Sequence, residues 1–163
     1  MIKINRKVEY ALMVLKMMKD KGDELTTARE ICDQFKTPFD TTAKVMQLMN
    51  TVGMLHSQKG VKGGYTLACD LNQVSYMELV ELIEGKSFMM DCHDRGDGQG
   101  PCDFYNNCNI SRPIKRLNDY LINIFKALTL NELLAEDNLL ALKKLPEKKV
   151  EHCPLVDNSK VTL

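Results

Sequence analysis

The sequence predicts a mainly α-helical fold with one small β-hairpin, and three observations support this prediction. Apolar residues recur at helical spacing in separate stretches of the 163-residue chain. Two short alternating runs flank a glycine-rich segment at residues 59–64, which predicts a hairpin turn. Beyond this hairpin an apolar stripe at steps of three and four covers residues 114–128, which predicts one long amphipathic helix.

The region before the hairpin is expected to begin with two helices. The first covers residues 7–18 and ends before Gly22. Thr26 or Thr27 can cap a short second helix, which carries an apolar face of its own. Glu30 lies three residues after Thr27, as in a capping box.

A third helix is expected to run from a cap at Asp40 or Thr41 to about Thr51. Two short helices joined by a tight turn form a helix-turn-helix unit, whose second helix enters the major groove of DNA by its N-terminal part. Gln47 is suited to adenine, and Lys44 to guanine or phosphate. The pattern points Val45, Leu48, Met49 and Val52 inward and exposes Thr41, Thr42, Lys44 and Gln47 for DNA contact.

The hairpin that follows this unit is a candidate wing. Strands are expected at residues 55–58 and 65–67, joined by the glycine-rich turn at residues 59–64. The glycines permit close approach to DNA, and Lys59 and Lys62 suit phosphate or minor-groove contacts. The alternative is a solvated hairpin turn that makes no contact with DNA.

The second half of the chain is expected to hold a helix capped by Ser75 and closed by Gly85, followed later by the long amphipathic helix. A capping box at Thr129 opens one more short helix, from Glu132 to about Lys144. The long helix is a candidate dimer seam, and packing against its own head is the alternative. The seam comprises Ile114, Leu117, Leu121, Ile124, Phe125 and Leu128.

The chain divides into four predicted regions. They are a winged helix-turn-helix head at residues 1–85, a cysteine loop at 86–112, a dimerisation region at 113–145 and a flexible tail at 146–163. The net charge is zero, but residues 1–68 hold 11 Lys and Arg against 7 Asp and Glu, and the remainder holds 11 against 15. A basic N-terminal part and an acidic C-terminal part suit a nucleic-acid head joined to a sensor region.

Three cysteines, Cys92, Cys102 and Cys108, lie within seventeen residues that are rich in glycine and polar side chains. Thiolates on such flexible backbone can converge on one metal centre. Three thiolates with one open position favour a 4Fe-4S cluster over 2Fe-2S, because each cysteine can hold one iron. A structural zinc site is the alternative, and His93 is one candidate for the fourth ligand.

Composition narrows the class of protein further. No stretch approaches about 18 consecutive apolar residues and the N-terminus lacks a signal-peptide layout, so no membrane is expected and the predicted location is cytoplasmic. In that reducing compartment clustered cysteines are more often ligands than disulfides. An enzyme is not predicted, because no substrate-activating constellation of Ser, His and Asp is evident. A small iron-sulfur redox protein would have no use for the wing.

Four segments together resemble the Rrf-two family of winged-helix transcription regulators. They are residues 8–12, the wing at residues 59–68, the three cysteines, and residues 128–134. The resemblance covers about residues 4–134. It implies a homodimer that binds a double-stranded DNA operator, with long helices that cross between subunits. It also implies an iron-sulfur cluster that tunes the affinity for DNA.

The sequence departs from the family pattern in two places. The first cysteine gap, nine residues, is longer than is usual in the family. Some members carry a histidine ligand three residues after the last cysteine, where this chain has Ser111. Other members use a carboxylate on the first helix of the partner subunit, and Glu9 occupies that place here. The alternative for Glu9 is a solvent-facing residue paired with Lys16 or Arg6.

Overall fold

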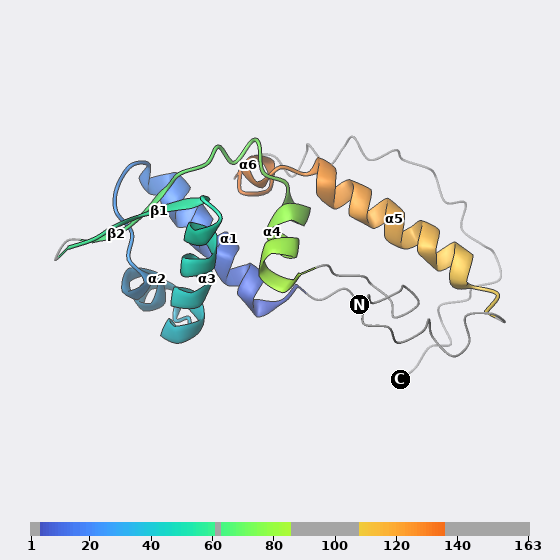
Figure 1. Cartoon of the computed structure of the whole chain (residues 1–163), viewed down its shortest axis with the longest axis horizontal. Coiled ribbons are helices and arrows are strands. Elements are labelled where there is room, and N and C mark those ends of the chain that lie inside the picture. Colours follow the sequence, from blue (N-terminus) through green and yellow to red (C-terminus); the bar gives the residue numbers. More distant parts are fainter. Residues whose placement is uncertain (1–3, 61–62, 86–107, 136–163) are drawn as a thin grey trace, which may run out of the picture.

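The structure, a computed structural model, describes residues 4–60, 63–85 and 108–135. It confirms a mainly α-helical fold with one antiparallel hairpin, in which a helical head carries the hairpin at one end and a long helix at the other (Figure 1). None of the described helices is both long and apolar enough to cross a membrane. The elements are α1 (Arg6–Lys21), α2 (Ala28–Phe35), α3 (Phe39–Thr51), β1 (Leu55–Gln58), β2 (Gly64–Leu67), α4 (Tyr76–Glu84), α5 (Ser111–Ala127) and α6 (Leu130–Leu133).

Helix α1 is the centre of the head. The Asn5 side chain accepts a hydrogen bond from the Lys7 amide at 3.0 Å and so caps its N-terminus. Gly22 ends it with a positive φ of 66°, a conformation that glycine adopts at little cost. One face of α1 is buried against α3, α4 and β2. The buried residues of α1 are Val8, Ala11, Val14, Leu15, Met17 and Met18.

Helix α2 begins where the sequence predicts, and Thr27 is the residue that caps it. The Thr27 hydroxyl accepts from the Glu30 amide at 3.1 Å. The reciprocal half of the expected capping box is not formed, because the Glu30 carboxylate instead pairs with Lys21 Nζ at the end of α1. This ion pair joins the C-terminal end of α1 to the first turn of α2.

Helix α3 starts earlier than the sequence predicts. Pro38 is the N-cap residue, and it makes no side-chain capping hydrogen bond. Asp40 and Thr41 lie inside the first turn, so the predicted cap at either of them is wrong. Pro38 has extended backbone and disfavours helical conformation at the residue before it, so α3 begins directly after it at Phe39.

The hairpin has the expected strands, and β2 begins one residue early at Gly64. The register pairs Leu55 with Leu67 and Gln58 with Gly64. A third segment adds to the outer side of β2, since the Thr26 and Tyr65 backbones exchange two hydrogen bonds of 2.9 Å. The hairpin is thereby anchored to the segment that precedes α2.

Helices α4 and α6 each begin with a capping box, and their N-cap residues are neighbours. Ser75 caps α4 and Thr129 caps α6, as the sequence predicts. The capping box of Thr129 with Glu132 was also predicted, and the structure adds a second one, of Ser75 with Glu78. The two N-cap residues also face each other in an isolated antiparallel bridge. The predicted helix from Glu132 to about Lys144 is wrong where the structure describes it, since α6 spans Leu130–Leu133 and residues 134 and 135 are not helical. Residues 136–144 lie outside the described ranges.

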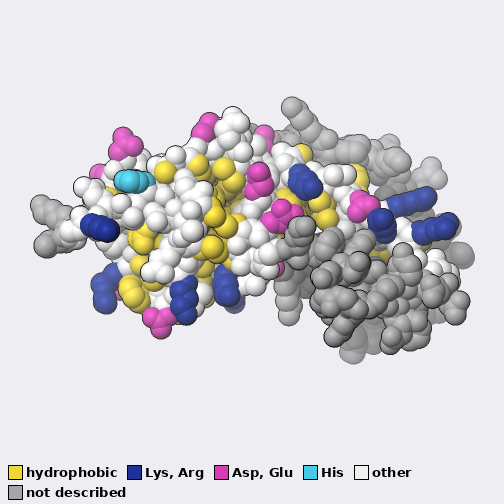
Figure 2. All heavy atoms as spheres, in the orientation of Figure 1, with side chains coloured by type: hydrophobic (Ala, Val, Ile, Leu, Met, Phe, Trp, Pro, Cys, Tyr) yellow, Lys and Arg dark blue, Asp and Glu magenta, His cyan; other side chains and the backbone are white. Residues whose placement is uncertain are grey.

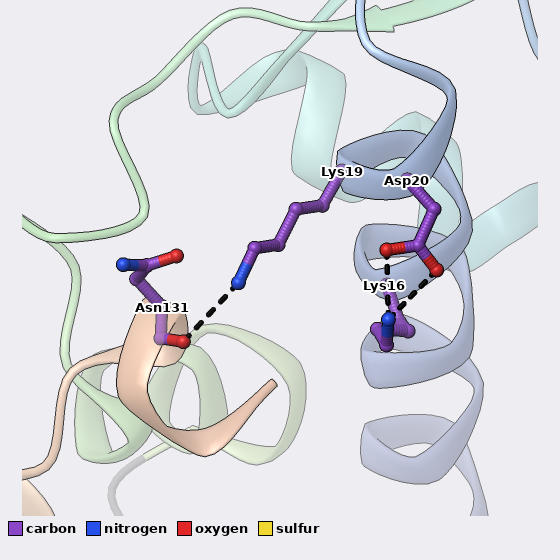
Figure 3. Close-up of polar contacts among 4 residues, drawn as sticks. All are labelled: Lys16, Lys19, Asp20 and Asn131. Carbon is purple, nitrogen blue, oxygen red and sulfur yellow. Dashed lines mark hydrogen bonds and ion pairs between the residues drawn. The ribbon is translucent and has the colours of Figure 1, made fainter. Parts of the chain in front are cut away.

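The segment after α5 returns to the head and closes its core. The Leu130 amide donates to the Val74 carbonyl at 2.8 Å, and the Leu130 side chain is fully buried. Figure 3 shows Lys19 of α1 reaching toward the Asn131 carbonyl, to which its Nζ donates at 3.3 Å. Lys16 pairs instead with Asp20 within α1. The core that includes Leu130 also holds Leu15, Met18, Ile31, Met46, Met49, Leu55 and Leu79.

Candidate nucleic-acid interface and cysteine loop

The outer face of α3 presents most of the polar residues expected there. Lys44 and Gln47 are exposed and Thr41 is half-buried. Lys44 has no ion-pair partner among the described residues. Figure 2 shows Lys and Arg side chains along the edge of the head that carries α2 and α3, with an acidic side chain among them. Lys44 therefore offers an unpaired positive charge on the outer face of α3, which a nucleic acid backbone attracts.

The prediction that Thr42 is exposed for DNA contact is wrong. It is fully buried, and its hydroxyl lies 2.9 Å from Thr37 Oγ1 and 3.0 Å from the Pro38 carbonyl oxygen. Its side chain therefore faces the turn between α2 and α3 and is not available to DNA. The sequence pattern gave no sign of this, because threonine is common on both buried and exposed helix faces.

The inward face of α3 is also rotated from the prediction. Val45 and Met49 are buried as expected, and Met46 is buried as well. Leu48, however, is 36% exposed and Val52 is 50% exposed, so the prediction that both point inward is wrong. The buried arc is centred between Val45 and Met46, which places Leu48 at its edge. Val52 follows the last turn of α3, where the chain leaves the core.

The wing presents one of its two lysines in the described part of the chain. Lys59 is exposed and has no ion-pair partner among the described residues, whereas Lys62 lies outside them. The turn is tightly built, because a Cβ placed on Gly63 would lie 2.5 Å from the Gln58 carbonyl oxygen. Only glycine fits at this position without distorting the turn.

One cation near α3 was missed by the sequence analysis. Arg29 lies on α2, and its guanidinium carbon is 5.6 Å from the ring centroid of Phe39, the first residue of α3. Helical periodicity classes Arg29 as an ordinary surface residue. No signal within α2 predicts a contact with an exposed aromatic ring that follows ten residues later.

Cys108 is the one loop cysteine within the described ranges, and Cys92 and Cys102 lie outside them. Cys108 is a free, half-buried thiol placed just before α5. The Ser111 hydroxyl donates to the Cys108 carbonyl at 3.2 Å, so it is engaged with the backbone. The described residues alone contain no group of three metal-ligating side chains, and two of the three predicted thiolates are not among them.

The start of α5 suits a negatively charged group. Ile110 is its N-cap residue and provides no side-chain cap, so the first backbone amides carry the positive end of the helix dipole. No acidic residue lies in the first turn, and Arg112, Lys115 and Arg116 are all exposed. A cluster held by three thiolates is anionic, so this donor set and its surroundings fit an iron-sulfur centre.

Glu9 is held by Arg6 in the single chain. The Arg6 Nη1 and Glu9 Oε2 atoms are 2.9 Å apart, in an ion pair between residues three positions apart on α1. The Arg6 side chain is 79% exposed, and exposed pairs of this kind contribute at most about 1 kcal/mol. The pairing with Arg6 matches one of the two predicted alternatives, and the weakness of the pair leaves Glu9 available to exchange its partner.

Helix α5 has two different ends. At its C-terminal end Phe125 packs edge-on against Tyr76 of α4, with ring centroids 5.2 Å apart. Toward its N-terminal end Leu117 is 50% exposed, and Ile110 and Tyr120 are similarly exposed. The remaining stripe residues Ile114, Leu121, Ile124 and Leu128 are half-buried. Packing on the chain's own head therefore accounts for the end of the stripe, and an apolar surface remains at its start.

A helix-turn-helix unit and a hairpin wing, each with an exposed lysine, together define the chain as a winged-helix regulator of transcription. The family model Rrf2, described as an iron-dependent transcriptional regulator, matches residues 4–136. The chain belongs to this family, which confirms the resemblance seen in the sequence.

Curated relatives cover most of the chain. It is 28% identical over 125 residues to the HTH-type transcriptional repressor NsrR of Streptomyces coelicolor, covering 77% of this chain and 81% of the relative. It is 27% identical over 144 residues to the HTH-type transcriptional regulator NsrR of Oceanobacillus iheyensis, covering 85% and 95%. These relatives are transcription regulators rather than enzymes.

Solved structures share the fold. CymR, the global cysteine regulator of Bacillus subtilis, superposes with a TM-score of 0.63 at 18% identity, covering 82% of this chain and 97% of CymR. IscR of T. potens superposes with a TM-score of 0.58 at 15% identity, covering 82% and 86%. At these identities the likeness establishes the winged-helix architecture alone.

Proposed function

We propose that the protein is a homodimeric, DNA-binding transcription regulator whose operator affinity is controlled by an iron-sulfur cluster. Cys92, Cys102 and Cys108 would hold the cluster, which is 4Fe-4S rather than 2Fe-2S. One observation carries the proposal: the cysteine loop is inserted between α4 of the DNA-binding head and α5. The family description as iron-dependent regulators supports the same assignment.

The head supplies the DNA contacts. Thr41, Lys44 and Gln47 on α3 would face the major groove, where Gln47 can pair with adenine and Lys44 with guanine or phosphate. Lys59 and Lys62 on the wing would contact phosphates or the minor groove. In a dimer the two heads must meet half-sites about one helical turn apart, near 34 Å. Affinity therefore depends on how far apart the two heads are held.

Helix α4 links the loop to the recognition helix. Helix α4 packs against α1, α3 and α5, so a displacement of α4 would also shift α3. Its N-terminal end is fixed by the Ser75 capping box, and its C-terminal end leads directly into the loop. When bound, the cluster would supply an iron site with a weak fourth ligand, exposed to small molecules or to iron loss. Glu9 of the partner subunit is the proposed fourth ligand, and it would tie the loop of one subunit to α1 of the other.

Anaerobic purification with assays for iron, sulfide and zinc tests the proposal. A coloured protein with equal amounts of iron and sulfide is expected, and Cys108→Ala should abolish the colour. Cys69→Ala is the matched control, because burial raises the pKa of the Cys69 thiol and leaves it a poor ligand. A colourless wild-type protein with one zinc would contradict the proposal and make the loop a structural zinc site.

A further inference from the structure

The pairing of Arg29 with Phe39 is not explained by the stability of the head. Phe39 is 48% exposed, so its ring adds little to the core. Arg29 is also exposed, and Asp33 lies one turn further along α2, at the spacing where ion pairs form on helices. Within the described part of the chain Arg29 nevertheless makes no ion pair. Its guanidinium instead lies over the Phe39 ring at 5.6 Å.

The contact carries a positive charge from α2 to the start of α3. Phe39 is the first residue of α3, and α2 and α3 pack against each other. In a helix-turn-helix unit the N-terminal part of the second helix enters the major groove while the first helix crosses the DNA backbone. A cation held between the two helices therefore lies where a phosphate strand borders the groove.

The chemistry of the pair suits phosphate. The attraction between a guanidinium and an aromatic ring uses the face of the ring and does not require the N–H groups of the arginine. Those N–H groups form a rigid fork that matches two phosphate oxygens. The ring also restricts the freedom of a long side chain, so less conformational entropy remains to be lost when DNA binds.

We propose that Arg29 is a DNA phosphate contact and that Phe39 is the residue that positions it at the entrance of α3. This inference rests on the proposed DNA-binding function and adds a contact from α2 to those of α3 and the wing. It also accounts for a recognition helix that contains no arginine of its own. Phe39 acts through Arg29 and is a positioning residue.

The first test uses a fluorescent 30-base-pair duplex of random sequence, because a phosphate contact is independent of sequence. Affinity is measured by anisotropy between about 50 and 200 mM salt. Arg29→Ala should weaken binding and reduce the slope of log K against log salt by about 0.9 for each protomer in contact. The control is Lys126→Ala, which removes an exposed cation from the last turn of α5 and should leave the slope of the wild-type protein.

The second test separates positioning from direct contact. Phe39→Leu keeps an apolar side chain but removes the ring, and it should weaken binding about two- to fivefold, the value of an exposed cation–π contact. In the Arg29→Ala background Phe39→Leu should have no further effect. An equal loss in both backgrounds would overturn the positioning role, since Phe39 would then act on DNA without Arg29. Circular dichroism of each variant confirms that the head is folded.

The outcomes distinguish this inference from the proposed function. If the wild-type protein binds no duplex, the DNA-binding function itself fails. If the wild-type protein binds and Arg29→Ala keeps its affinity and salt slope, only the role of Arg29 is overturned. If Arg29→Ala weakens binding to an operator selected from a random library but not to the random duplex, Arg29 contacts a base and the phosphate assignment is overturned.

Discussion

Replacing Leu130 with alanine tests whether the segment after α5 is part of the core of the head. Leu130 is 0% exposed, and its amide donates to Val74 at 2.8 Å. Leu→Ala changes at fully buried sites cost about 2 to 5 kcal/mol, because apolar surface is lost and a cavity remains. Taking about 3 kcal/mol, and about 2 to 4 °C per kcal/mol for a chain of this size, we expect the Tm to fall by about 6 to 12 °C.

The assays are thermal unfolding for the Tm and urea unfolding for the free energy. Both are followed by far-ultraviolet circular dichroism at one fixed protein concentration, because subunit association also stabilises the fold. Leu133→Ala is the matched control, since Leu133 lies on the same short helix but is 38% exposed. It should cost less than about 1 kcal/mol. Equal losses in the two variants would refute the reasoning, because the burial of Leu130 would then contribute nothing to the stability of the head.

Three further predictions concern α1, the wing and α4. Glu9→Gln should leave the fold intact but make the cluster lose its visible absorption faster in air, whereas an unchanged decay would remove Glu9 as a ligand. Gly63→Ala should distort the wing turn, where the new Cβ would lie 2.5 Å from Gln58 O, and weaken binding to duplex DNA; wild-type affinity would show that the wing is not a contact. Ser75→Ala should cost about 1 kcal/mol through the lost helix cap, measured by urea unfolding at neutral pH. Hydrogen bonds from Ser75 lower the pKa of Glu78, so this capping stabilisation is present above the usual carboxyl pKa and is lost as pH falls through the lowered one. The difference in stability between the wild-type and Ser75→Ala proteins should therefore narrow in acid but not vanish, because Ser75 Oγ still accepts from the Glu78 amide. A constant difference would contradict the role of the Glu78 carboxylate.

Local signals predicted much of the fold. Ser75 and Thr129 are both the N-caps that the sequence predicts, and the predicted capping box of Thr129 with Glu132 is formed. The two strands also formed where alternation and glycine placed them. Each of these features is decided by residues within one turn or one hairpin. The physics that selects them is contained in a short stretch of sequence, and sequence reasoning therefore succeeds there.

Orientation between elements was predicted less well. Thr42 and Leu48 were placed on the wrong sides of α3 because its apolar residues are consistent with more than one rotation, and packing of α3 on α1 and α2 decides between them. Glu30 was expected to complete a capping box, but Lys21 on another helix competes for it. The Arg29–Phe39 contact likewise joins two helices. Each of these outcomes depends on tertiary contacts that no local pattern encodes.

The cysteine site combines a local signal, the spacing of its thiolates, with an arrangement that depends on tertiary structure. The thiolate spacing predicted a metal centre, and the structure adds an uncapped, positively charged start of α5 beside Cys108. Cys92 and Cys102 lie outside the described residues, so the convergence of the three thiolates stays a prediction. The same holds for the dimer seam, for which the structure adds the exposed side chain of Leu117.

The central claim is that the state of the cysteine loop controls affinity for DNA, and one titration tests it most directly. The operator is selected from a random duplex library by the anaerobically purified protein, and its affinity is measured for cluster-loaded and chelator-stripped protein at the same salt concentration. A coupling of about 1 to 3 kcal/mol between the two sites predicts affinities that differ roughly 5- to 150-fold. Equal affinities for folded, dimeric protein in both states would contradict the account.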